Sequence, residues 1–101
     1  MALPYAKKIV LSCPNGSTPR LGDLVEDFIR NGVVFVAVVG TDCSNVEDLI
    51  DWIVIGPDGT RNYDLLTSSH PGQSIDEAVA FARSLTGEFS GQEVQVVELQ
   101  S

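Results

Sequence analysis

Two thiols, one imidazole and one carboxylate are the side chains of this sequence best suited to chemistry. The chain contains two cysteines and a single histidine. A cysteine just before a helix is a better nucleophile because the helix dipole stabilises its thiolate, and a histidine held by a carboxylate can act as its base. The same groups can also bind a metal ion. The candidates for such a thiol- or metal-dependent site are Cys13, Asp42, Cys43 and His70.

Simpler roles compete with this chemistry. The spacing of the four residues matches no known template for metal ligands, so we name no metal ligand and expect no cofactor. Cysteine is often buried as plain packing, and an aspartate can fix a turn through its own side chain. Hydroxyl groups offer a second kind of site, since they can hold an anion at a helix N-terminus. The candidates for anion binding are Thr18, Ser69 and Ser74.

The first half of the chain predicts a strand, a helix and a second strand. Residues 7–12 form a short apolar run that predicts a strand. Thr18 followed by proline predicts the N-cap of a helix, which Gly32 ends. Residues 33–39 contain no polar side chain, which is typical of a strand buried on both faces of a parallel sheet. The apolar stripe of the helix consists of Leu21, Leu24, Val25, Phe28 and Ile29.

A second helix follows this apolar strand. Ser44 and Glu47 have the spacing of a capping box at its start. The helical phase of the apolar residues continues through Ile53, so we expect the helix to reach about Ile55. The alternative is that residues 52–55 begin a hairpin that turns at the following Gly-Pro-Asp-Gly sequence.

The last part of the chain predicts a strand, a helix and a final strand. Residues 62–68 give the weakest strand signal. Ser74 and Glu77 form another capping box, and Gly87 ends the helix that they begin. Residues 93–99 mix valines with polar side chains, as edge strands do. The apolar stripe of this third helix consists of Ile75, Ala78, Val79, Ala82 and Leu85, with Phe81 on its flank.

This order of elements predicts a single α/β domain over residues 1–101. The expected fold is a three-layer α-β-α sandwich with about four mainly parallel strands in β-α-β-α-β-α-β order. Ligands of such sheets bind beyond the carboxyl ends of the strands. The loops expected there, residues 13–18, 40–44 and 67–74, contain both cysteines, the aspartate and the histidine. The sequence therefore predicts that the reactive side chains share one edge of the sheet.

Net charge limits the partners of this domain. Fourteen acidic and six basic residues give a net charge of −8, which disfavours nucleic acid and anionic membrane surfaces. The longest apolar run, residues 33–39, is too short to cross a bilayer. We see no signal-peptide pattern and no disulfide framework. The expected location is therefore cytoplasmic.

Acidic side chains gather on the outer faces of the first two helices. Such a face usually serves solubility, but it can also bind a basic partner. Trp52 lies off the apolar stripe and beside these acids, where an exposed aromatic residue would anchor an interface. The residues expected at this interface are Trp52, Glu47, Asp48 and Asp51.

Two resemblances bear on function. Residues 7–18 resemble the start of the small phosphotransferase-system IIB domains, which implies that Cys13 carries a phosphoryl group beside Gly16 and Thr18. Pro14 and Pro19 depart from that pattern because they remove amide donors from the loop. Residues 40–85 look like a family of short uncharacterised bacterial proteins, and this likeness implies a compact domain without an assigned chemistry.

These observations leave the function unknown and favour a non-enzymatic interaction or accessory module with a protein partner or a second copy of the chain. The first alternative is the thiol- or metal-dependent site on the carboxyl edge of the sheet. The second alternative is a cysteine phosphocarrier of the IIB type.

Overall fold

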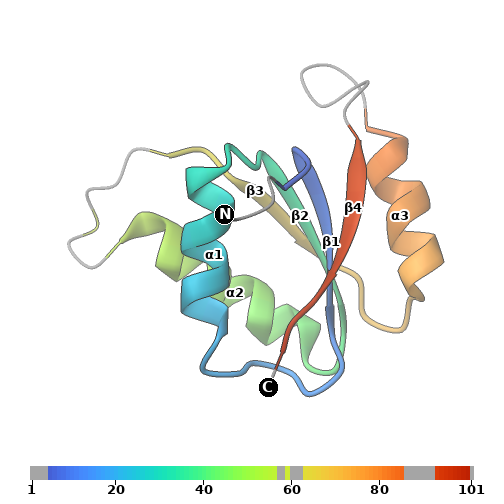
Figure 1. Cartoon of the computed structure of the whole chain (residues 1–101). Helices are drawn as coiled ribbons and strands as arrows, with labels where there is room; N and C mark the ends of the chain where they lie inside the picture. The colour runs from blue at the N-terminus through green and yellow to red at the C-terminus, as the bar shows by residue number, and fades with distance from the viewer. Residues whose placement is uncertain (1–4, 57–58, 60–62, 86–92, 101) are drawn as a thin grey trace.

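The computed structural model describes residues 5–56, 59, 63–85 and 93–100. Strands and helices alternate throughout this part of the chain (Figure 1). The elements in order are β1 (Lys8–Cys13), α1 (Leu21–Arg30), β2 (Phe35–Gly40), α2 (Cys43–Ile55), β3 (Leu66–Ser69), α3 (Ile75–Arg83) and β4 (Val94–Glu98). None of the helices in the described ranges is long and apolar enough to span a membrane.

The four strands form one parallel sheet in the order β3-β2-β1-β4. The two central strands are the most apolar segments, and nearly all of their side chains are buried. This burial confirms that the apolar segment at residues 33–39 is interior, because a strand without polar side chains is stable only when both faces are covered. Strand β4 lies at one edge of the sheet, which confirms the prediction that residues 93–99 form an edge strand.

Helices cover both faces of the sheet, which confirms the three-layer architecture. Helices α1 and α2 lie together on one face, and α3 lies alone on the other (Figure 1). The larger core cluster lies under α1 and α2. The smaller cluster, under α3, includes Val10, Ala37, Ala78 and Ala82. Small alanine side chains let α3 approach the sheet closely.

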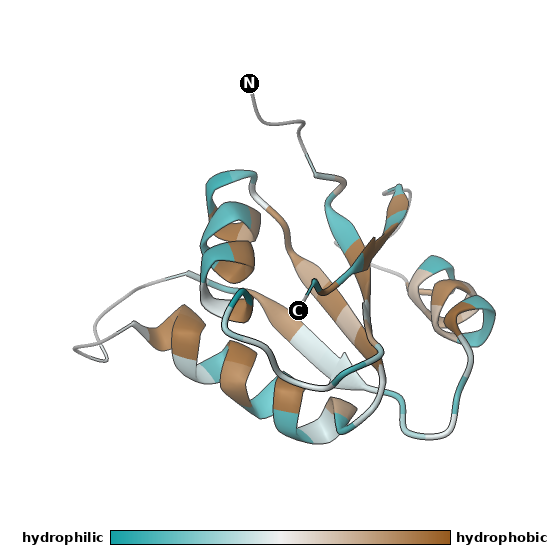
Figure 2. Cartoon of the chain, turned by 60° about the horizontal axis from the view of Figure 1, so that its bottom comes forward, coloured by the Kyte–Doolittle hydropathy of each residue, from teal (hydrophilic) through white to brown (hydrophobic). Residues whose placement is uncertain are grey.

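Helix α2 ends at Ile55, so the helix and not the hairpin is correct for residues 52–55. Val46, Ile50 and Val54 form its buried stripe, and this stripe can only be continuous in a helix. Gly56 ends the helix with a positive φ of 88°. The buried residues of α2 belong to the larger core cluster. The polar residues of β3 are pale in the hydropathy colours of Figure 2.

The starts of the first two helices differ from the predictions. The N-cap prediction for Thr18 is wrong, since α1 begins at Leu21 and the Thr18 hydroxyl donates to the carbonyl of Gln100. The capping box at Ser44 is also wrong. Helix α2 begins two residues earlier than that cap implies, at Cys43, with Asp42 as its N-cap in a left-handed conformation, and the Ser44 hydroxyl donates to Ser69. In both cases a tertiary partner competes successfully with the local cap.

The capping box of Ser74 and Glu77 is confirmed. Ile75, expected in the buried stripe of α3, is instead 39% exposed because it lies at the first turn, beyond the sheet. The third strand, predicted over residues 62–68, is observed at Leu66–Ser69, so the following loop begins after Ser69 and not at residue 67. The predictions for Asn62 and Gly87 lie outside the described residues.

Candidate functional site

Both cysteines lie in the core cluster under α1 and α2. Cys13 ends β1, Cys43 begins α2, and both are buried free thiols. Burial, together with the nearby Cys43 thiol, raises the pKa of the Cys13 thiol to about 11 from an ordinary value of 9.0. At neutral pH Cys13 is therefore a neutral thiol in an apolar site, the opposite of an activated nucleophile.

His70 packs on the other face of the sheet. Its ring lies 4.7 Å from that of Phe81 on α3, and only 7% of the residue is exposed. Nε2 lies 2.8 Å from the hydroxyl of Ser68, and Nδ1 lies 3.0 Å from the amide oxygen of Gln73. Since the amide oxygen only accepts, Nδ1 carries the proton and Ser68 donates to Nε2. Both ring nitrogens are thus engaged in holding the turn between β3 and α3.

The four residues of the predicted thiol or metal site are not assembled by this fold. The structure brings Cys13 and Cys43 near one another, but the sheet separates them from His70. Asp42 is exposed at the start of α2. Within the described ranges, no three histidine, cysteine or acidic side chains are grouped so that they could hold a metal ion. Shared position on one edge of a parallel sheet therefore does not ensure a shared site, because side chains alternate between its faces.

The anion-site candidates each hydrogen-bond within the protein. Thr18 contacts the Gln100 carbonyl, Ser69 contacts Ser44, and Ser74 caps α3. Asp76 and Glu77 in the first turn of α3 add negative charge that repels an anion there. Burial of Cys13 also leaves its sulfur without the exposure that phosphoryl transfer between proteins requires.

Trp52 and its neighbours form an exposed feature on α2. The side chain points away from the sheet and is 71% exposed, as its helical phase predicts, and Ile55 is 43% exposed. Beside them is an open hollow of about 480 Å³. It is lined by Glu26, Trp52, Ile53, Ile55, Gly56 and Gly59. The sequence places Glu26 on the acidic outer face but does not show that it lies beside Trp52, and it does not single out Ile55, because the packing of α1 against α2 determines which residues meet.

Glu47 and Asp51 point toward β3 and not toward Trp52. The hydroxyl oxygen of Thr67 lies 2.8 Å from Oε2 of Glu47 and 2.7 Å from Oδ1 of Asp51. A hydroxyl has one proton and can donate to only one carboxylate at a time. The predicted interface is thus divided into two neighbouring parts, with Asp48 and Trp52 outermost on α2 and the Thr67–Glu47–Asp51 cluster at the edge of the sheet.

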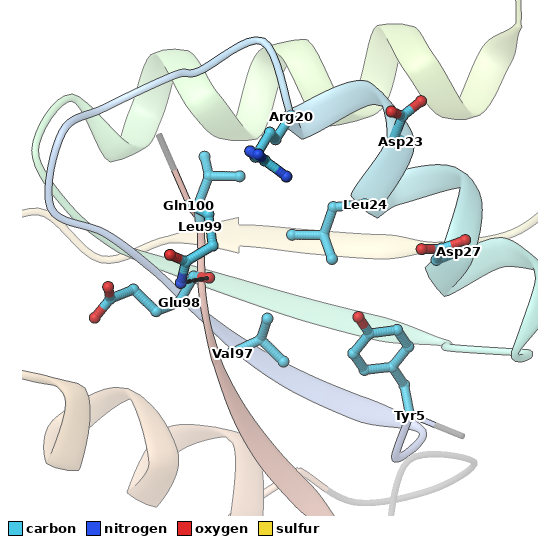
Figure 3. A pocket seen from close by; sticks show the side chains of 9 residues that line it. All are labelled: Tyr5, Arg20, Asp23, Leu24, Asp27, Val97, Glu98, Leu99 and Gln100. Atoms are coloured by element: carbon cyan, nitrogen blue, oxygen red, sulfur yellow. Dashed lines mark hydrogen bonds between the residues drawn. The ribbon is translucent and has the colours of Figure 1, made fainter. Parts of the chain in front are cut away.

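A second hollow, of about 250 Å³, lies between α1 and β4 (Figure 3). It opens beside the carboxyl ends of β1 and β4, where strand order reverses and α/β proteins often bind ligands. Apolar side chains, including Leu24 and Val97, line it together with one basic side chain, Arg20, and three carboxylates. Its volume is below the range of most small-molecule pockets, and its mixed charges assign no ligand class. The lining is Tyr5, Arg20, Asp23, Leu24, Asp27, Val97, Glu98, Leu99 and Gln100.

Comparisons with known proteins name no activity for this chain. No curated protein and no solved structure matches the chain. A family model described as a domain of unknown function matches residues 2–100, nearly the whole sequence. The expectation of a family without assigned chemistry is confirmed, and bacterial origin stays a prediction. The chain belongs to the DUF7684 family, a domain of unknown function.

Proposed function

We propose that this protein is an interaction module whose α1–α2 surface binds a basic partner protein, with Trp52 as the anchor. The observation that carries the proposal is the 71% exposure of Trp52 at the edge of an open hollow. Tryptophan is among the residues most enriched at the energetically dominant centres of protein interfaces. Exposed Ile55 beside it extends the apolar contact.

Charge supports a basic partner. Helices α1 and α2 carry six acidic side chains, three on each helix, and one basic side chain. That one base, Arg30, is paired with Asp27. A surface of one sign speeds encounter with a partner of the opposite sign and repels a second acidic protein. The two unpaired thiols suit a reducing compartment, so we place this role in the cytoplasm.

The single tryptophan of the chain reports directly on this surface. A protein with Trp52 exposed should emit at long wavelength and be quenched readily by acrylamide, and binding of a partner should protect it. Partners captured from lysate by the wild-type protein would be identified and purified. Their affinities would then be measured for the wild-type protein, for Trp52→Ala and for a control variant. Trp52→Ala should weaken binding by at least about thirtyfold, or about 2 kcal/mol.

The matched control is Val96→Ala, which removes an exposed apolar side chain from β4, far from α2 in strand order. It should leave the affinity unchanged. Affinity of the wild-type protein should also fall with added salt, since the surface charges are screened. Equal affinity of the Trp52 and Val96 variants, or capture of a second copy of the chain only, would contradict the proposal.

A further inference from the structure

Strand β3 forms an open edge of the sheet, with β2 as its neighbour on one side only within the described part of the chain. The N–H groups of Leu66 and His70 donate to carbonyls of β2 at 3.0 and 2.9 Å. Alternate residues of a parallel strand direct their backbone groups to opposite sides. The N–H and C=O groups of Thr67 and Ser69 therefore point outward, where another strand could pair with them.

This edge is short, at four residues, but it lacks two features that commonly prevent pairing with another chain. Its residues, Leu66–Ser69, include no charge and no proline, and both are common protections of edge strands. Leu66 is also 49% exposed. Strand β4, at the opposite edge, instead carries an exposed glutamate, Glu98.

The two sides of the β3 edge differ in chemistry. On the α2 side, Glu47 and Asp51 share the single proton of the Thr67 hydroxyl. The carboxylate that does not receive this proton lies at hydrogen-bond distance from a lone pair of the hydroxyl oxygen, and the two repel each other. A cation placed beside the two carboxylates would relieve this repulsion. On the α3 side, Leu66 and Phe81 are 49% and 41% exposed and offer an apolar contact.

We propose that the β3 edge binds an extended segment of a partner protein, as a fifth strand, in which basic and apolar side chains alternate. Successive side chains of a strand point to opposite faces, so the basic ones would reach Glu47 and Asp51 while the apolar ones cover Leu66 and Phe81. Backbone pairing supplies affinity and the alternating side chains supply selectivity. This inference rests on the proposed interaction function and names the form of the basic partner.

A second copy of the chain fits this edge poorly. Antiparallel pairing of two β3 strands would bring a second set of Glu47 and Asp51 side chains toward the first. Like charges across such an edge are destabilising, and the whole chain carries a net charge of −8. A basic segment meets the same edge with charges of the opposite sign.

The test uses a synthetic peptide of about six residues, the usual length of a strand, in which lysine and valine alternate. Amide hydrogen exchange and chemical shifts are recorded by NMR on the whole chain. The peptide should slow exchange at Thr67 and Ser69 at least about tenfold, because their N–H groups become hydrogen-bonded. Val96, whose N–H points outward from β4, should not change. A peptide with glutamate in place of lysine should not bind.

Paired variants separate the backbone from the side chains. Ser69→Pro and Ser69→Ala both remove the hydroxyl, but only the proline removes the outward N–H, so Ser69→Pro should weaken binding about tenfold relative to Ser69→Ala. Glu47→Gln combined with Asp51→Asn should weaken binding by a similar factor and reduce its salt dependence. If the proline variant does not fold, methylation of alternate peptide amides gives the same comparison on the wild-type protein.

The inference is overturned if the glutamate peptide binds as well as the lysine peptide. It is also overturned if the two Ser69 variants, or the methylated and unmethylated peptides, bind equally. A dimer of the chain whose Thr67 and Ser69 amides are already protected would overturn it as well. The proposed function fails separately. A natural partner that depends on Trp52 but binds Ser69→Pro as well as Ser69→Ala would support the α1–α2 interface and exclude the fifth strand.

Discussion

Replacing Gly40 with alanine tests how closely β1 and β2 approach at their carboxyl ends. Gly40 ends β2, pairs with Cys13 and has a φ of +107°, which residues with a Cβ rarely adopt. A Cβ would lie 2.7 Å from the carbonyl oxygen of Cys13 and 3.0 Å from its carbonyl carbon. Both are backbone atoms, so rotation of a side chain cannot relieve the overlap.

Two effects determine how much stability the Gly40→Ala substitution removes. The backbone conformation alone costs a residue with a Cβ about 1–3 kcal/mol. Separating the strands would also lengthen the 2.9 Å hydrogen bond from the Thr41 N–H to the Cys13 carbonyl, a loss of about 1 kcal/mol. We expect Gly40→Ala to lower the free energy of unfolding by about 3 kcal/mol. This is a large loss, because the whole free energy of unfolding of a typical domain is only about 5–15 kcal/mol.

Urea denaturation followed by far-ultraviolet circular dichroism measures this change. The control is Gly22→Ala, because Gly22 lies within α1 and a Cβ there would meet no atom within 4 Å. It should raise the free energy of unfolding by about 0.5–1 kcal/mol, since alanine favours the helix. A Gly40→Ala protein within about 1 kcal/mol of wild type would refute the close approach of the two strands at this point.

Two further predictions concern the buried thiol and the helix caps. The raised pKa of Cys13 means that its contribution to stability is complete below about pH 9 and is lost as pH rises toward about 11. The difference in unfolding free energy between wild type and Cys13→Ala should therefore be constant at neutral pH. Between about pH 9 and 11 it should fall by at most about 1.4 kcal/mol per pH unit. A constant difference up to pH 11 would contradict the burial of this thiol. Ser74→Ala removes an observed capping box and should cost about 1 kcal/mol, while Ser44→Ala, where no capping box forms, should cost less than about 0.5 kcal/mol. Equal losses in thermal or urea denaturation would show that the caps were assigned wrongly.

Much of the fold could be predicted because its signals are local. The spacing of Val46, Ile50 and Val54 identifies α2 as a helix without knowledge of what it packs on. The all-apolar segment before it identifies an interior strand. Helix starts were less predictable, because the hydroxyls of Thr18 and Ser44 donate to residues distant in the sequence, which no local pattern reveals.

The candidate site was less predictable than the fold. The sequence placed Cys13, Cys43 and His70 near one edge of a sheet, and the parallel strands do bring their backbones there. Which face each side chain takes depends on the register of a strand, and a shift of one residue exchanges the faces. The tertiary structure put the thiols under α1 and α2 and the imidazole against α3.

Composition and the periods of single elements are enough to predict the alternation of strands and helices, the acidic charge and the outward position of Trp52. The edge position of β3 and the contact of Thr67 with both Glu47 and Asp51 follow only from the packed fold. Those contacts join side chains of α2 to the next strand across a separation of 16 and 20 residues. Such pairings depend on strand order and helix packing, which no local period encodes.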